Sequence, residues 1–419
     1  MRRTGGHSGT DPAFLRGLTE RRLSRRALLR SAAVGAGALG LSGLAAACTS
    51  SNTAPSASAF TGGQTGELDF ANWLLYIDKA KTADGTVIHP TLQEFTRQTG
   101  IRVNYAELVT ENDTFFQGIQ PRLQAGLDPG WDIIVLTNGP VLTELLKLDF
   151  LTPLDRSMTP NFVKNAGPLV MDPIYDPGNL HTMAWQSGLT GIGYDPNLTG
   201  REITSLMDLF DPAFAGKVGM IADISDLPNL TLLAIGVKPE TSTPADWKEA
   251  AALLERQRRE GVVRGYYQQS YINRLSAGDV ALTMAWSGDI FQKNKSDAAK
   301  GLQFVIPNEG GLIWTDNMCI PRNAAHPVDA ITYMDWVYQP KVAAQIAEWV
   351  NYLTPVPAAQ PVVAADAADS GSSALEAVAK SPLVFPTPDE ISKLHSYRVL
   401  SEEEQLEWNR LFGPYLQAT

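Results

Sequence analysis

Short apolar runs and amphipathic segments alternate along most of this 419-residue chain. An apolar pattern at residues 68–73 predicts a strand, and the helical pattern at 91–99 ends at Gly100, before a second strand that begins at Ile101. A helix at 115–125, a strand at 131–136 and a helix at 141–148 repeat this order. The alternation predicts an α/β fold in which helices cover a mainly parallel sheet.

The second half of the chain continues the alternation. Strand patterns occupy 218–223 and 280–286, and a helical pattern follows Leu227. Helices are predicted at 328–338 and 341–349, then a Pro- and Ala-rich stretch, then an amphipathic helix at 402–411. The chain is longer than one ordinary hydrophobic core requires, so its length favours a body of two parts.

The N-terminal segment follows a different pattern. The sequence SRRALLR at Ser24–Arg30 precedes an apolar, small-residue stretch that ends in LAAAC at Cys48. This pattern predicts a twin-arginine export signal at residues 1–47, with Cys48 as the lipid acceptor after cleavage. The stretch is short for a bilayer span, which favours a cleaved signal over an uncleaved anchor. The small polar residues that follow predict a flexible tether at 48–66.

Charge and cysteine content narrow the class of protein. The chain has 34 basic and 45 acidic residues, and its surplus of acid is larger still from Cys48 onward, because eight basic but only two acidic residues precede it. An acidic surface repels nucleic acid and mildly favours cationic solutes. If Cys48 is acylated, Cys319 has no disulfide partner and is expected to be a small core residue. We expect no nucleic-acid partner, no metal and no cofactor.

Aromatic and carboxylate side chains stand near the ends of several predicted strands. They are Trp73, Tyr76, Asp223, Asp226, Trp286, Trp314, Asp316 and Tyr352. The carboxyl ends of parallel strands meet at one edge of a sheet, where α/β proteins bind ligands. A ligand that carries ammonium groups on a methylene chain needs carboxylates as hydrogen-bond acceptors and aromatic faces for its apolar part. The set therefore suits a cationic amine.

Each of these residues, taken singly, also has a structural interpretation. Asp223 and Asp226 precede an apolar helical run, and for this pair helix capping is the stronger interpretation. A lone Trp at a strand end usually packs against its neighbours, and Asp316 suits a turn or cap. Only a pattern that specifies all of the residues together favours a binding site.

Such a pattern is present, because the chain resembles the spermidine/putrescine-binding proteins of bacterial polyamine importers from about residue 68 to about residue 352. The block EGGLIWTD at Glu309–Asp316, with Cys319-Ile320-Pro321 after it, is the most specific part of the resemblance. Five further stretches carry it: NWLLY at 72–76, WDIIV at 131–135, MIADISD at 220–226, MAWSG at 284–288 and YLTP at 352–355.

The resemblance implies a two-lobed periplasmic-binding-protein type II fold that closes on its ligand. Residues 67–189 and 315–360 would form lobe 1, and 190–314 and 361–419 lobe 2, with crossings near Leu189, Thr315 and residue 360. It places Trp73, Tyr76 and Thr137 on one side of the cleft and Asp223, Asp226 and Trp286 on the other. Trp314 would contact the methylene chain, Asp316 would hold one ammonium, and Tyr352 would complete an aromatic box.

The same resemblance implies an exported, lipid-anchored, monomeric binding protein at the outer face of the cytoplasmic membrane. It would deliver spermidine or putrescine to the permease and ATPase subunits of an ABC importer. The sequence departs from the family at Leu74, where a polar residue is usual, and at Gly139, where a tyrosine is frequent. In the C-terminal section, His395, Tyr397 and Arg398 match too poorly for any position to be assigned as a contact.

Two other functions remain open from the sequence. Stacked tryptophans and carboxylates also suit a sugar, although a sugar site usually intersperses Asn, Gln and Arg among the acids, and the assigned positions hold only acids, aromatics and Thr137. An exported hydrolase needs a nucleophile with a base or a set of metal ligands, and no such motif is visible. The five histidines are widely separated along the chain. We therefore expect no catalytic residues.

Overall fold

The computed structural model describes residues 59–296 and 301–416. The export signal predicted at 1–47, the lipid acceptor Cys48 and the tether as far as residue 58 lie outside these ranges. Within them, no helix is both long and apolar enough to cross a membrane.

The first part of the described chain is a parallel β-α-β arrangement, as the sequence predicts. Strand β1 (Glu67–Trp73) lies between β4 (Arg102–Val109) and β5 (Ile133–Thr137) and pairs in parallel with both. Helices α3 (Pro90–Thr99), α4 (Asn112–Gln124) and α5 (Pro140–Lys147) connect or follow these strands. Gly100 ends α3 with a φ of 78°, a conformation that glycine adopts without steric cost.

A second parallel group forms from later residues. Strand β7 (Val218–Ile221) lies between β8 (Val263–Tyr267) and β9 (Leu282–Trp286). Helix α8 (Asp226–Ala234) follows β7, α9 (Pro244–Arg259) precedes β8, and α10 (Tyr271–Ala277) and α11 (Ser287–Ser296) flank β9. Strand β7, helix α8 and strand β9 agree with the sequence pattern, whereas β8, α9, α10 and α11 were not predicted.

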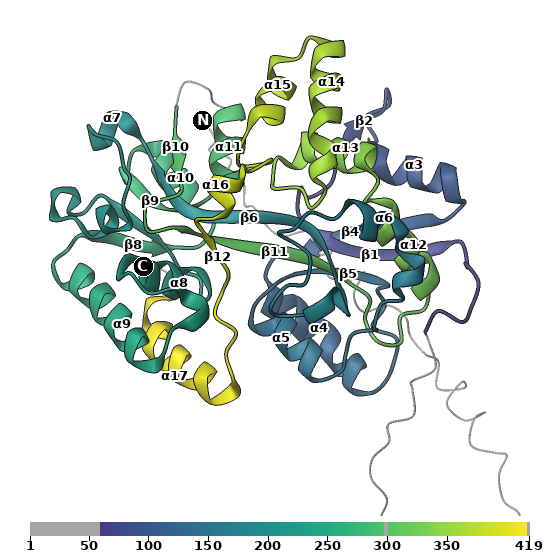
Figure 1. Ribbon diagram of the computed structural model, residues 1–419, viewed down its shortest axis with the longest axis horizontal. Coiled ribbons are helices and arrows are strands. Elements are labelled where there is room, and N and C mark those ends of the chain that lie inside the picture. The colour runs from purple at the N-terminus through teal and green to yellow at the C-terminus, as the bar shows by residue number, and fades with distance from the viewer. Residues whose placement is uncertain (1–58, 297–300, 417–419) are drawn as a thin grey trace, which may run out of the picture. The chain divides into compact units, whose positions relative to one another are not determined.

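Two long strands that the sequence analysis missed join the groups. Strands β6 (Thr182–Tyr194) and β11 (Gly311–Cys319) pair antiparallel, and the main sheet runs β4-β1-β5-β11-β6-β9-β7-β8 (Figure 1). Every residue of β6 is buried, so the strand has none of the polar alternation that identifies a half-exposed strand. Leu189 and Thr315, expected near chain crossings, lie in these two strands and pair with Ile313 and Ser187.

Further helices and small strands complete the described chain. Helices α12 (Pro327–Trp336) and α13 (Pro340–Val350) match their prediction, as does α17 (Glu402–Phe412). The Pro- and Ala-rich stretch forms helices α14 (Gln360–Ser370) and α15 (Ser373–Lys380). Short elements that no prediction covered are β2 (Ala80–Lys81), β3 (Val87–Ile88), α6 (Pro160–Asn165), α7 (Pro196–Thr199), β10 (Gln303–Val305), α16 (Pro388–Ile391) and β12 (Leu394–His395).

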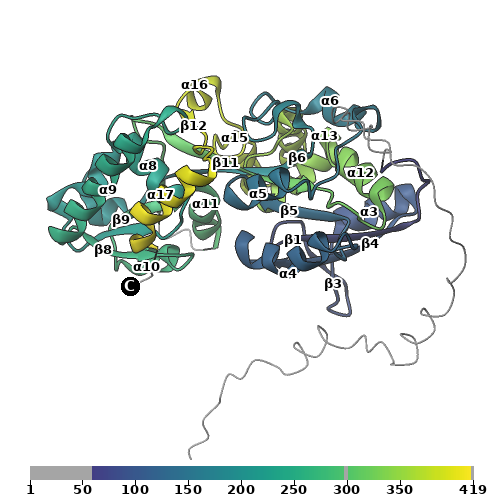
Figure 2. The same ribbon diagram turned by 90° about the horizontal axis from the view of Figure 1, so that it is seen from below.

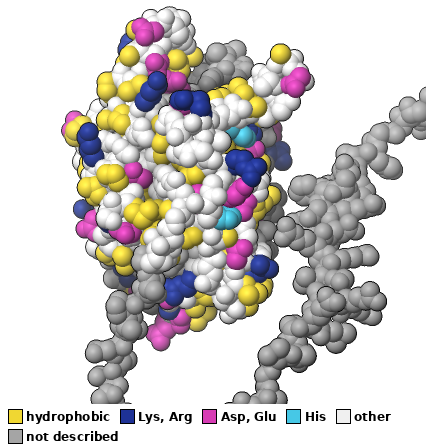
Figure 3. Space-filling view, turned by 90° about the vertical axis from the view of Figure 1, so that its right-hand side faces the viewer, with side chains coloured by type: hydrophobic (Ala, Val, Ile, Leu, Met, Phe, Trp, Pro, Cys, Tyr) yellow, Lys and Arg dark blue, Asp and Glu magenta, His cyan; other side chains and the backbone are white. Residues whose placement is uncertain are grey.

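Helices cover the sheet on the side seen in Figure 2, where α4 and α5 lie over one end and α8, α9 and α17 over the other. Buried apolar side chains from both groups of strands form one large core cluster, and a smaller one lies between β5, α4 and α5. Cys319 is fully buried, as predicted. The face in Figure 3, at the α3 and α12 end, carries acidic and basic side chains interspersed with apolar ones.

Candidate functional site

Asp316 is the centre of the first part of the site. It lies in β11 between β5 and β6, only 4% exposed, so its interpretation as a turn or cap residue is wrong. The Tyr76 hydroxyl donates to one carboxylate oxygen at 2.7 Å, and the Thr137 hydroxyl donates to the other at 2.7 Å. Two neutral donors from different strand ends thus hold a buried acid.

Trp314 and Tyr352 form an aromatic surface beside Asp316. Tyr352 lies 5.6 Å from the ring centroid of Tyr76 and 5.6 Å from that of Trp314. Trp314 pairs with Gly188 across the central strands, and a side chain at Gly188 would meet the indole at 2.1 Å. Asn351 ends α13 in a left-handed conformation, which Asn tolerates well, and so directs Tyr352 away from the helix.

Asp226 is the centre of the second part of the site. It is 2% exposed and accepts hydrogen bonds from the Thr190 hydroxyl (2.6 Å), the Trp286 indole (2.7 Å) and the Tyr397 hydroxyl (2.8 Å). Asp223 instead accepts the backbone N–H groups of residues 225 and 226, both at 2.8 Å. The helix-start interpretation is therefore confirmed in part: Asp226 is the acid in the first turn of α8, but Ser225 and not Asp223 occupies the N-cap position. The Asp226 carboxylate turns toward the central strands.

The two parts are joined by a third acid that the sequence analysis missed. Asp289, in the first turn of α11, accepts a hydrogen bond from the Tyr271 hydroxyl at 2.6 Å and lies 3.5 Å from the Tyr352 hydroxyl. Tyr271 in turn contacts the Trp286 ring and accepts the Trp286 backbone N–H. The sequence signal that could have identified Asp289 is its position three residues after Trp286, at the start of a helix.

Eight of the nine predicted ligand residues thus belong to one connected set of contacts. Trp73 is the exception, since it makes no hydrogen bond or ring contact with the other eight among the described residues, and its half-buried ring packs on the core. Tyr397, which the sequence left unassigned, belongs to the set. Gly139 lies close to Ser225. A side-chain carbon added at Gly139 would be 3.5 Å from the Ser225 hydroxyl oxygen.

Burial governs the protonation of these acids. It raises the pKa of Asp316 to about 6 against the opposing effect of the Thr137 and Tyr76 hydrogen bonds. Burial, reinforced by the charge of Asp223, raises the pKa of Asp226 to about 7, and burial raises the pKa of Asp289. No Lys, Arg or His of the described chain forms an ion pair with any of them, so only neutral donors oppose this desolvation.

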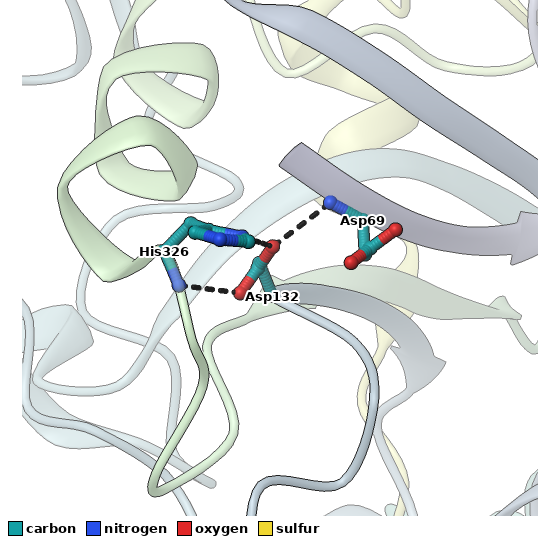
Figure 4. A group of neighbouring side chains, drawn as sticks. All are labelled: Asp69, Asp132 and His326. Atoms are coloured by element: carbon teal, nitrogen blue, oxygen red, sulfur yellow. Dashed lines mark hydrogen bonds and ion pairs between the residues drawn. The ribbon is translucent and has the colours of Figure 1, made fainter. Parts of the chain in front are cut away.

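A separate group of potential metal ligands consists of Asp69, Asp132 and His326, whose ligand atoms lie within 4.8 Å of one another (Figure 4). One Asp132 oxygen accepts the His326 backbone N–H at 2.7 Å. The other accepts the Asp69 backbone N–H at 2.8 Å and lies 2.9 Å from His326 Nδ1. These bonds already tie β1 and the start of α12 to the segment before β5, so the group has a structural role.

Comparison with known proteins identifies the family. Residues 91–371, well over half of the chain, match the model for bacterial extracellular solute-binding proteins. The chain belongs to this family. Members of this solute-binding family are binding proteins, which sets aside an exported hydrolase.

Two curated relatives are similar over most of their length. The putrescine-binding periplasmic protein SpuD of Pseudomonas aeruginosa is 27% identical over 353 residues, which cover 78% of this chain and 90% of SpuD. The spermidine/putrescine-binding periplasmic protein of Escherichia coli is 27% identical over 303 residues, 72% of this chain and 81% of that protein.

Solved structures show the same fold. The spermidine/putrescine ABC transporter substrate-binding protein PotD of Streptococcus pneumoniae superposes with a TM-score of 0.69 at 22% identity, over 84% of this chain and 99% of that one. The Tp0655 (TpPotD) lipoprotein of Treponema pallidum gives a TM-score of 0.66 at 16% identity, over 83% and 99%. The periplasmic-binding-protein fold expected from the sequence is therefore confirmed.

Proposed function

We propose that this solute-binding protein binds a polyamine, spermidine or putrescine, outside the cytoplasm and delivers it to the permease and ATPase of an ABC importer. The site supports this function through its charge. Asp226, Asp289 and Asp316 are held by hydroxyl and indole donors, and no side-chain cation of the described chain pairs with them. A buried carboxylate is costly unless it meets a positive charge, and the ammonium groups of a polyamine supply that charge.

The aromatic residues suit the rest of such a ligand. Trp314, Tyr352 and Trp286 lie along the contacts that connect Asp316 with Asp226. Methylene groups pack on aromatic faces, and an ammonium near a ring gains a cation–π contribution. In this proposal Asp316 holds one end of the amine, Asp226 with Asp223 holds the other, and Asp289 lies between them.

The proposed cleft lies between two lobes that meet at β6 and β11. The groups β4-β1-β5 and β9-β7-β8 flank these strands on opposite sides, which supports lobes built from 67–189 with 315–360 and from 190–314 with the C-terminal residues. Helices α14 and α15 pack against α13, so we favour a third crossing after α15 rather than near residue 360. Closure would desolvate the acids around the ligand and strengthen each ion pair.

The proposal of export and anchoring rests on the N-terminal sequence alone. The paired Arg25-Arg26 and the LAAAC stretch support a twin-arginine signal and acylation of Cys48, which would keep the monomeric protein at the outer face of the membrane. Mass spectrometry of the native protein tests this directly. A diacylglycerol modification on an N-terminal Cys48 is expected, and a mature chain that begins elsewhere without lipid would contradict the proposal.

Titration of tryptophan fluorescence tests the ligand class. Spermidine and putrescine are expected to change the emission and to compete with each other, because Trp286 and Trp314 lie within the site, whereas maltose should have no effect. Isothermal calorimetry of Asp316→Asn then tests the role of charge at nearly constant shape. The loss expected is on the order of 2 to 5 kcal/mol of binding free energy. Unchanged spermidine affinity would remove Asp316 from the site, and maltose binding would reassign the ligand class.

A further inference from the structure

Two aromatic rings of the site rest on glycine backbone. A side-chain carbon at Gly188 would lie 2.1 Å from the Trp314 ring, and one at Gly288 would lie 2.2 Å from the hydroxyl end of the Tyr352 ring. Neither glycine has a positive φ, so conformation alone does not require glycine at either position. Both positions are instead restricted by the ring that lies on them.

The two contacts differ in where they occur. Gly188 and Trp314 are paired residues of β6 and β11, inside one sheet. Gly288 is the second residue of α11, which follows β9, whereas Tyr352 follows α13. The Tyr352 ring therefore joins segments that belong to opposite lobes in the proposed function. A hydrogen bond of 3.4 Å from the Gln292 side chain to the Val350 carbonyl joins the same two segments.

We infer that Gly288 is a positioning residue. Because it has no side chain, the Tyr352 ring can pack on its backbone and contact the ligand when the lobes close. The inference rests on the proposed function. An alanine there would push the phenol end of Tyr352 out of this place and away from Asp289, which lies 3.5 Å from the hydroxyl. Lobe opening, as proposed, would separate the two segments and relieve this clash, and α11 itself would gain because alanine is a better helix former than glycine.

The Gly288→Ala protein separates a positioning role from a purely structural one. Its melting temperature without ligand should equal or exceed that of the wild type. Its spermidine affinity should fall at least about tenfold, and spermidine should no longer reduce its radius of gyration in X-ray scattering. Gly188→Ala is the matched control, because the same clash inside the sheet should lower the melting temperature. The inference would be overturned if Gly288→Ala bound spermidine and became compact like the wild type. It would also be overturned if the melting temperature of Gly288→Ala fell as much as that of Gly188→Ala.

A double variant tests whether Gly288 acts through the Tyr352 ring. Once Tyr352→Ala has removed the ring, adding Gly288→Ala should cost no further affinity, and an equal additional loss would overturn the inference. A wild-type protein that binds no amine would contradict the proposed function instead. The inference is then decided without amine by hydrogen exchange, which Gly288→Ala should accelerate in the peptides around residues 288 and 352, because the variant cannot form the contact between Gly288 and Tyr352 seen in this structure. Unchanged exchange in both peptides overturns it.

Discussion

Two groups of buried carboxylates in this protein have opposite surroundings. Asp132 accepts two backbone N–H groups and contacts the His326 ring, so its charge is satisfied by the protein itself. Asp316 and Asp226 are as deeply buried, yet neutral hydroxyl and indole groups are their partners. The comparison teaches that burial of an acid does not identify a binding site. Asp78, Asp329 and Asp335 are buried acids that also form no ion pair among the described residues, but each accepts a backbone N–H group. Asp226 and Asp316 accept only side-chain hydroxyl and indole groups, and this feature separates the proposed ligand residues from structural ones.

Among variants of the structural acids, Asp132→Asn should have the largest effect on stability. The amide would place an N–H donor against one of the N–H groups that the carboxylate accepts, and it would remove the charge beside His326. We expect the free energy of unfolding to fall by about 1 to 3 kcal/mol, measured by urea denaturation. Spermidine affinity at a temperature where the variant is folded should stay within about twofold. A folded variant that fails to bind spermidine would remove the distinction between the groups.

The pH dependence of binding is the next effect in size. The pKa of Asp316 is raised to about 6 and that of Asp226 is also raised, and ammonium groups require both acids to be ionised. Spermidine affinity should therefore fall as pH is lowered from 8 to 5, about tenfold per pH unit for each acid once pH is below its pKa. Calorimetry over this range checks the slope, and Asp316→Asn is the control, with a flatter profile. A pH-independent affinity would show that the acids do not contact the ammonium groups.

The same pKa shifts predict the opposite trend for stability without ligand. An acid whose pKa is raised in the folded state retains its proton more strongly there than in the unfolded chain. The stability from Asp316 is thus greatest below pH 4 and is lost as pH rises toward 6. Thermal denaturation with and without spermidine should show that the ligand stabilises most at high pH.

Tyr397→Phe should have the smallest effect. The variant removes one of three donors to Asp226 and leaves those of Thr190 and Trp286 in place. We expect spermidine affinity to fall by about two- to tenfold, since a single hydrogen bond to a charged group is lost. Loss of this donor also raises the pKa of Asp226, so the midpoint of the pH profile should move upward. An unchanged midpoint would show that Tyr397 does not act on this acid.

Local sequence patterns predicted the first parallel group and three elements of the second, but not β8, α9, α10 or α11, nor how the groups meet. The helix that ends at Gly100 and the buried strand before Thr137 follow from periodicity and from the turn preference of glycine. Strand β6 was missed because its continuous burial removes the alternation on which recognition depends. The Pro- and Ala-rich residues after α13 form two helices, because proline is tolerated in a first turn and alanine favours helix.

The predicted site rested mainly on family resemblance, which specified residue positions where composition could not. It located Asp226 and Asp316, but not Tyr397, which lies in a C-terminal section without usable similarity. The hydrogen bond between Asp226 and Tyr397 spans 171 residues, and no local signal reports such a separation. The first-turn position of Asp226 and the bonds of Asp223 to the start of α8 were predictable because they depend on neighbouring residues alone.

A crystal structure of the mature protein grown with spermidine tests the central claim most directly. We expect amine nitrogens within hydrogen-bonding distance of the carboxylates of Asp316 and Asp226, with the methylene chain against Trp314 and Tyr352. Spermidine bound elsewhere, or both carboxylates still held by their neutral protein donors with no amine nitrogen beside them, would contradict it.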